Sequence, residues 1–156
     1  MTKLKHILLT IIFILPFSSC GYTPIFSMKN VNFNIEKIEY LGNRVVRQKL
    51  DNALSSYKNK PNKEKKIILI IKSSKNVVIA SKNSKGEAQT KRMKISANVK
   101  IIFDEDNVFE RNFSKATTYT AVNRKSDQKS NENKLIENLS NEIAQQIIFE
   151  ILEKTK

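Results

Sequence analysis

The sequence predicts an α+β fold in which two amphipathic helices pack on one face of a four-stranded, mostly antiparallel sheet, in the order β-α-β-β-β-α. Residues 93–103 alternate apolar and polar side chains, which is the period of a half-buried strand. Residues 67–71 form an unbroken aliphatic run, and residues 135–152 repeat apolar side chains at helical spacing. These three segments indicate one layer of helices over one sheet, with no internal repeat and no second domain.

The first strand and the first helix follow one another closely. Residues 31–35 alternate apolar and polar side chains, and the strand continues toward Tyr40 with one slip in register. Asn43 comes next and can cap a helix with its side chain. The helix is predicted over residues 44–58, where apolar residues recur at helical spacing. They are Val46, Leu50, Ala53, Leu54 and Tyr57.

The aliphatic run at residues 67–71 predicts a strand that is central in the sheet and covered on both faces. Residues 77–79 either extend this strand or form a bent continuation, and residues 81–86 indicate an exposed loop. The next strand should bury one face and leave the other mostly polar. The apolar side consists of Met93, Ile95, Ala97, Val99, Ile101 and Phe103, and the polar side includes Lys94, Ser96, Asn98 and Lys100.

Residues 104–107 predict a hairpin turn that returns the chain antiparallel. The acidic residues in this turn could in principle bind calcium, but they lack the ligand spacing and the glycine of an EF-hand, so a turn is favoured. On the returning strand, Phe109, Phe113 and Tyr119 share one face.

A long helix is expected at the end of the sequence. Asp127 or Ser130 can cap it, and about 25 residues at 1.5 Å each give a rod of about 37 Å, long enough to cross the sheet. Its apolar stripe consists of Leu135, Leu139, Ile143, Ile147 and Ile151, flanked by Ile136, Ala144, Ile148 and Leu152.

The first 20 residues have the pattern of a bacterial lipoprotein signal. Lysines precede an apolar run at residues 7–17, which is about half of the roughly 20 residues that a membrane-spanning helix needs. The four residues ending in Cys20 resemble a lipobox, although Phe17 stands where leucine is more usual. We therefore expect a signal peptide over residues 1–19, a lipidated extended leader over residues 20–30 and a single α+β domain over residues 31–156.

Cys20 is the only cysteine, and one thiol in an exported chain cannot form an internal disulfide. Acyl chains on its sulfur and amine would make a stable membrane tether, because each buried CH₂ contributes roughly 0.8 kcal/mol. The alternative is an ordinary small residue near a classical cleavage site. Gly21, rather than aspartate, follows the cysteine. In lipoproteins of this pattern, such a residue implies sorting to the outer membrane.

The chain is strongly basic, with a formal net charge of +13, of which about +11 remains after residues 1–19 are removed. Such charge fits a nucleic acid, an anionic membrane surface or a phosphorylated glycolipid. Of the 28 basic residues, 23 are lysines and only five are arginines, whereas bidentate phosphate recognition favours arginine. Since Lys, Asn and Ile are all abundant, compositional drift is an equally good explanation for much of the charge.

The composition argues against enzyme chemistry. The only histidine, His6, lies in the predicted signal peptide, and Cys20 would be acylated. A mature domain without imidazole or thiolate lacks essential members of zinc sites and of Ser-His-Asp or Cys-His sites. With three glycines in the chain, no Gly-rich phosphate loop can form. The sequence therefore predicts a protein that is not an enzyme and that has no cofactor or metal.

A family resemblance adds to these predictions. The predicted mature chain starts with Cys20-Gly21-Tyr22-Thr23-Pro24-Ile25-Phe26. This segment resembles the start of alphaproteobacterial members of the LPS-assembly lipoprotein family, LptE, and the element order and size are similar as well. Thr90-Lys91-Arg92 at the start of the alternating strand adds support. The resemblance implies a lipid-anchored outer-membrane protein facing the periplasm that plugs the LptD β-barrel, helps it assemble and contacts lipopolysaccharide.

The polar side of the alternating strand is the candidate contact surface for lipid A phosphates. We single out Lys91, Arg92, Lys94 and Lys100, with a solvated sheet face as the competing interpretation. Two other functions are considered. One is a lipoprotein adaptor that binds an anionic envelope polymer or another envelope complex. The other is a nucleic-acid binder, which export and the lack of a stacking motif argue against.

Cys20→Ala is expected to leave a soluble or uncleaved form, because neither lipidation nor cleavage before the cysteine could then proceed. Fractionation of membranes and soluble extracts measures this outcome. Normal recovery of the variant in the outer membrane would refute the lipid anchor.

Overall fold

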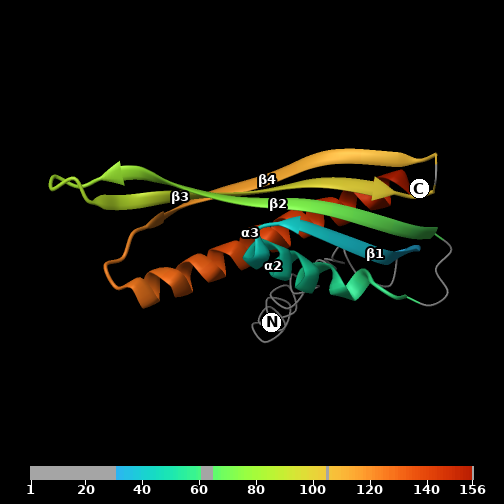
Figure 1. The fold of residues 1–156 in the computed structure, drawn as a ribbon, viewed down its shortest axis with the longest axis horizontal. Helices are drawn as coiled ribbons and strands as arrows, with labels where there is room; N and C mark the ends of the chain where they lie inside the picture. Colours follow the sequence, from blue (N-terminus) through green and yellow to red (C-terminus); the bar gives the residue numbers. More distant parts are fainter. Residues whose placement is uncertain (1–30, 61–64, 105, 156) are drawn as a thin grey trace, which may run out of the picture. The chain divides into compact units, whose positions relative to one another are not determined.

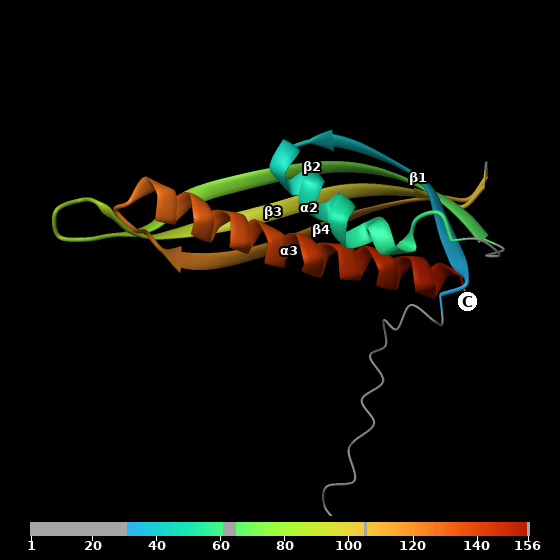
Figure 2. The ribbon, with the colours of Figure 1, turned by 90° about the horizontal axis from the view of Figure 1, so that it is seen from below.

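Four strands and two α-helices make up the chain in a computed structural model that describes residues 31–60, 65–104 and 106–155 (Figure 1). The sheet order is β1-β2-β3-β4, with β1 parallel to β2 and the other neighbours antiparallel. Both helices lie on one face of the sheet (Figure 2). The predicted fold class is confirmed. The elements are β1 (Phe33–Gly42), α2 (Arg44–Leu54), the 3₁₀-helix η3 (Ser55–Tyr57), β2 (Lys65–Lys82), β3 (Ala88–Ile102), β4 (Val108–Thr120) and α3 (Lys125–Lys154).

The segments predicted as signal peptide and lipidated leader, including Cys20, lie outside the described residues. Of the helices in the described ranges, none has the length and apolar character needed to cross a membrane.

The helix α2 forms the crossover between the two parallel strands. As predicted, Asn43 caps it: its side-chain oxygen accepts from the backbone N–H groups of Val45 and Val46, both at 3.1 Å. The helix ends at Leu54 rather than at Lys58 as predicted. The hydroxyl of Ser55 donates to the Asn52 carbonyl at 2.7 Å, and the chain tightens there into a 3₁₀ turn.

The sheet is buried on one face only. The alternate side chains that face the helices are buried from residue 67 to residue 73 of β2 and from residue 93 to residue 101 of β3, which confirms the predicted core face of β3 over that range. Phe103, predicted to continue this face, lies beyond the end of the strand and is half-buried. The expectation that residues 67–71 are covered on both faces is wrong, because Ile68 and Ile70 lie half-buried on the face opposite the helices. The strand is nonetheless internal to the sheet, and it runs on unbroken through residues 77–79. The core side chains of these two strands are Ile67, Leu69, Ile71, Met93, Ile95, Ala97, Val99 and Ile101.

The predicted slip in the first strand is confirmed as a register shift between Ile35 and Lys37. The shift leaves Glu36 out of the pairing, so that Tyr40 comes to the helix side of the sheet. There its hydroxyl donates to Asp51 of α2 at 3.1 Å. Burial and then this carboxylate raise the pKa of Tyr40, while the hydrogen bond from Lys58 helps to hold the pKa of Asp51 below its usual value.

The long helix α3 begins earlier than predicted. Its N-cap is Arg124, whose side chain makes no capping bond, and Asp127 instead lies in the first turn, where a carboxylate favours the helix N-terminus. The helix spans 30 residues rather than about 25. Its apolar stripe packs against the sheet and α2 as expected. The buried side chains are Ile136, Leu139, Ile143, Ala144, Ile147, Ile148 and Ile151.

Gly42→Ala is expected to destabilise the fold by about 2–4 kcal/mol, because two penalties add. Gly42 has φ +91°, and a Cβ there would lie 2.0 Å from the Ser73 carbonyl oxygen, which accepts the Asn43 N–H at 3.0 Å. Relieving the clash would cost that hydrogen bond. Urea unfolding of the full chain measures the change.

Gly86→Ala is the matched control for this variant. Gly86 also has positive φ, +81°, but a Cβ there would meet nothing within 4 Å. It should cost only about 1–2 kcal/mol, the penalty of a left-handed conformation for a residue with a Cβ. Equal losses in the two variants would contradict the close approach at Gly42.

Candidate functional site on the open face of the sheet

The face of the sheet opposite the helices, here called the open face, is polar along most of its length. The register brings like residues together across the strands: Ser74, Ser96 and Ser114 form one row. In the next row Asn98 lies opposite Asn112, and its amide donates to Glu110 at 2.9 Å. Both described helices lie on the other side of the sheet, which Figure 1 shows edge-on. It is therefore a hydrated surface of hydroxyls, amides and lysines rather than a second core.

At the end of the open face beside the β3–β4 turn, three apolar side chains lie next to one another. Ile68 and Ile102 pair across β2 and β3, and Val108 pairs with Ile102 from β4. Val108 is 43% exposed, and the two isoleucines are half-buried. This end of the surface can contact apolar groups, whereas the serine and asparagine rows can only offer hydrogen bonds.

Three of the four predicted contact residues, Arg92, Lys94 and Lys100, lie on the open face of β3 and are exposed. They do not form one cluster. Lys94 and Lys100 are six positions apart in the strand, which is about 20 Å. Lys100 also lies directly opposite Glu110 in the register, so a carboxylate offsets its charge. Arg92 and Lys94 are thus the more available pair for an anion.

Lys91 lies on the other side of the sheet. Its neighbour in β4 is Tyr119, whose hydroxyl donates to Glu132 of α3 at 2.8 Å. Gln128 donates to the same carboxylate at 2.6 Å and accepts the Val122 N–H at 2.9 Å. Lys91 therefore belongs to a polar junction between β4 and the start of α3, and not to the open face.

The charges of this junction shift two pKa values. Burial opposes the ionisation of Glu132, but hydrogen bonds from Gln128 and Tyr119 outweigh it and the pKa of Glu132 lies below its usual value. The nearby lysines Lys75 and Lys91 act in the same direction. Burial, followed by the bond to Glu132, raises the pKa of Tyr119. The junction thus holds a charged carboxylate beside a neutral phenol.

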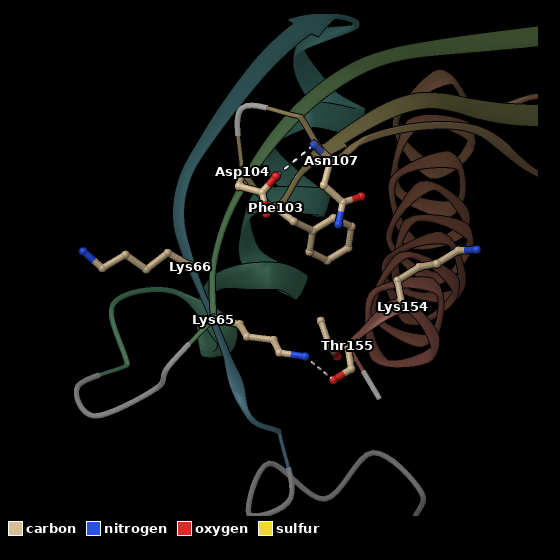
Figure 3. A pocket seen from close by; sticks show the side chains of 7 residues that line it. All are labelled: Lys65, Lys66, Phe103, Asp104, Asn107, Lys154 and Thr155. Carbon is tan, nitrogen blue, oxygen red and sulfur yellow. Dashed lines mark hydrogen bonds between the residues drawn. The ribbon is translucent and has the colours of Figure 1, made fainter.

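A pocket of about 500 Å³ lies where the start of β2 meets the end of α3 (Figure 3). Lys65 donates to the Thr155 carbonyl at 2.6 Å, and the Asn107 N–H donates to Asp104 at 2.9 Å. The ammonium group of Lys154 lies 4.2 Å from the centre of the Phe109 ring. Three lysines and the Phe103 ring therefore give the pocket positive charge and one aromatic side chain. It is lined by Lys65, Lys66, Phe103, Asp104, Asn107, Lys154 and Thr155.

Sequence reasoning missed both the junction and the pocket. Lys65 and Thr155, which are bonded at the pocket, are 90 positions apart in the chain. No local spacing signals such a meeting. The alternation of β4 predicted that Tyr119 shares a face with Phe109 and Phe113, which is the one signal that could have suggested a partner on α3. In the described ranges, no three His, Cys, Asp or Glu side chains are grouped so as to hold a metal ion.

A family model for LptE, described as lipopolysaccharide-assembly, matches residues 31–151. The chain belongs to this family. The resemblance predicted from residues 20–26 is therefore confirmed by a match that begins only after them, in the folded part of the chain. No curated protein matches the sequence.

Two solved lipoprotein structures share the fold of this chain at low sequence identity. Rare lipoprotein B from Shewanella oneidensis has a TM-score of 0.55 and 8% identity, over 77% of this chain and 96% of that chain. Lipoprotein B from Nitrosomonas europaea has a TM-score of 0.50 and 12% identity, over 76% of this chain and 83% of that chain. At these identities the likeness extends to the fold alone.

Glu132→Gln is expected to reduce the loss of folding stability that the protein shows as the pH falls. The pKa of Glu132 is lower in the folded protein than its ordinary value of 4.5. The ionised carboxylate therefore contributes its full stabilisation of the fold above pH 4.5, and this stabilisation is lost as the pH falls through the lower, folded-state pKa. Thermal or urea unfolding at pH values below and above 4.5 measures the difference.

Glu153→Gln, at an exposed position of the same helix, is the control for the loss of one acidic residue. If the stability of Glu132→Gln fell with decreasing pH as steeply as that of the wild-type chain, the junction would not stabilise the ionised Glu132 carboxylate.

Proposed function

We propose that this chain is a lipid-anchored subunit of the outer-membrane machinery that assembles lipopolysaccharide, and that it docks in and helps to assemble the LptD β-barrel. Membership of the LptE family over residues 31–151 is the observation that carries this proposal. The chain would act by shape and charge, not as an enzyme. Cys20 would bear the lipid and hold the domain at the periplasmic side of the outer membrane.

The polarity of the open face supports docking inside a barrel. The interior of a large outer-membrane barrel is polar and water-filled, and a plug must present hydroxyls, amides and charges to it. The rows of Ser74, Ser96 and Ser114 and of Asn98 and Asn112 offer such groups on the open face. An apolar second face would instead have required a further layer of the same chain.

Direct contact with lipopolysaccharide is proposed for Arg92 and Lys94 first, with Lys100 as a more distant site. Both Arg92 and Lys94 are exposed on the open face, and their charges suit the phosphates of lipid A. Lys91 would contribute only indirectly, because it lies with Glu132 on the opposite face.

A pull-down of the tagged chain from native membranes in mild detergent, at low and at high salt, tests the proposal. We expect a large β-barrel protein to remain bound at both salts, because contacts made by shape and apolar groups are not screened. Co-purification of no barrel would sink the proposal. If only envelope polymers were retained, and only at low salt, the adaptor interpretation would be favoured. The pocket lined by Lys65 and Lys154 would then be the candidate site for the polymer.

The same pull-down distinguishes the candidate lipopolysaccharide contacts. Arg92→Gln with Lys94→Gln should lower the lipopolysaccharide recovered per barrel, whereas Lys91→Gln should leave it close to the wild-type amount. An equal loss in both variants would contradict the division between the two faces.

A further inference from the structure

The pocket between the start of β2 and the end of α3 carries a net positive charge. Lys65, Lys66 and Lys154 line it together with a single acidic residue, Asp104. Among the described residues, none of the three ammonium groups forms an ion pair. The Asp104 carboxylate instead accepts the backbone N–H of Asn107 at 2.9 Å. The lysine charges therefore remain available to an anion.

Polar groups and one aromatic ring lie on two sides of this pocket. Figure 3 shows Phe103 and Asn107 on one side, and Lys65 with Thr155 on the other. Lys65 donates to the Thr155 carbonyl at 2.6 Å, which holds its ammonium group in place. An ammonium group has three N–H donors, so two remain for a ligand. The oxygens of a phosphodiester, which only accept hydrogen bonds, match these donors.

Three apolar side chains adjoin the pocket through the β3–β4 turn. Ile102 directly precedes Phe103, and Val108 directly follows Asn107. The third, Ile68, pairs with Ile102 across β2 and β3. All three lie at the end of the open face, where Val108 is 43% exposed. Grouped apolar side chains and lysines without ion pairs thus occur together at one end of the domain, here called the turn end.

One lysine belongs to both the pocket and the open face. Lys66 lies two residues before Ile68 and therefore on the same side of β2. Lys37, which pairs with Ile68 from β1, is already held by Glu39 at 2.6 Å. A lysine beside an apolar group is typical of a surface that lies in a membrane interface. There the apolar side chains enter the boundary of the hydrocarbon, and the ammonium groups stay at the level of the phosphates.

The opposite end of the sheet also has exposed lysines, but its apolar side chains are not grouped. Lys82 and Lys85 are exposed at the β2–β3 loop. Val78 and Ile79 are 49% and 52% exposed, but they are successive residues of β2 and point to opposite faces. Charge alone therefore does not distinguish the two ends of the sheet. The turn end differs because its charge is combined with an apolar group.

The chain enters the domain at the turn end. Phe33, at the start of β1, pairs with Lys65 at the start of β2 (Figure 2). Val31 follows Cys20 by 11 residues, which span at most about 38 Å. The β2–β3 loop lies the length of β2 away, 18 residues or about 60 Å. A lipid on Cys20 would therefore limit the distance between the turn end and a bilayer much more tightly than the distance between the loop and the bilayer.

We propose that the turn end binds the surface of a bilayer that contains anionic phospholipids. The pocket lysines bind the lipid phosphates, and the apolar side chains enter the interface beside them. The serine and asparagine rows lie further along the open face and remain available to a barrel. The inference rests on the lipid anchor of the proposed function, and it adds that the anchored domain directs its β2–β3 loop away from the bilayer. The residues of this surface are Lys65, Lys66, Lys154, Ile68, Ile102 and Val108.

Nuclear magnetic resonance of the full chain, purified with its lipid and placed in lipid nanodiscs, tests the proposal. The discs contain phosphatidylcholine, alone or mixed with phosphatidylglycerol, and a small amount of lipid with a spin label on its head group. We expect the backbone signals of Asn107 and Thr155 to broaden strongly in the anionic discs and little in the neutral discs, because the lysines are attracted to anionic lipid. The signal of Gly86, in the β2–β3 loop, should stay sharp in both. Equal broadening in the two kinds of disc, or broadening at Gly86 alone, would overturn the proposal.

Two pairs of lysine substitutions separate the ends of the sheet. Lys66→Gln with Lys154→Gln should remove most of the broadening in the anionic discs, and it leaves the Lys65 bond to Thr155 in place. Two lysines near an anionic surface change the affinity about 30-fold. Lys82→Gln with Lys85→Gln removes the same charge from the other end and should leave the broadening unchanged. Equal losses in the two double variants would contradict a specific role of the turn end.

Val108→Thr tests the apolar part of the surface without changing charge. A hydroxyl in place of a methyl group should reduce the broadening at Asn107, because it opposes entry into the hydrocarbon boundary. Val78→Thr is the matched control, since Val78 is 49% exposed and also lies on the open face, but near the other end of the sheet. Equal broadening in the two variants would overturn the entry of the apolar group into the interface.

Failure of the lipid anchor and failure of this inference give different results. The mass of the purified chain shows whether Cys20 is acylated. An acylated chain whose Asn107 and Thr155 signals stay sharp in anionic discs would overturn the inference and leave the anchor intact. An unacylated chain that sediments with anionic but not with neutral vesicles would support the inference without the anchor, and one that sediments with neither would overturn it. Signal shifts at the pocket with free glycerol phosphate, but no broadening in anionic discs, would assign the pocket to a soluble anion and also overturn the inference.

Discussion

Burial of the sheet on one face only is the constraint on which the rest of the structure depends. In β2 and β3, side chains alternate between the core under the two helices and the open face. A slip of one residue in either strand would move its whole aliphatic set into water and its lysines into the core, at a cost of about 1.5–3 kcal/mol for each large side chain exposed. The register is therefore strongly specified, and with it the identity of every residue on the open face.

The same constraint explains how the chain begins. A strand that pairs parallel to its successor needs a crossover, and α2 provides it while covering one part of the core. The path from β1 into α2 passes so close to β2 that only a residue without a side chain fits at position 42. The Asn43 cap follows at once, since the helix must begin where the strand ends. Sheet pairing, turn and helix start are thus coupled over three consecutive residues.

How much could be predicted from the sequence depended on whether the signal was local. The alternation of β3, the Asn43 cap and the slip in β1 are local patterns, and each prediction held. The helix ends were less well predicted, because Ser55 competes for backbone bonds and Arg124 begins α3 without a side-chain cap. The exposure of Ile68 was misjudged, since a run of β-branched residues does not reveal whether a second layer exists. Lys91 was grouped with Arg92 by sequence proximity, although adjacent strand residues face opposite ways.

The two ends of the open face differ in what they can contact, because the register fixes which side chains share each row. Beside the β3–β4 turn, Ile68, Ile102 and Val108 lie together, whereas Arg92 and Lys94 lie toward the other end of β3. A contact with the charged end is screened by salt, and a contact with the apolar end is not. The separation follows from the strand register, and it lets a sheet with one uncovered face present two kinds of surface without a second layer.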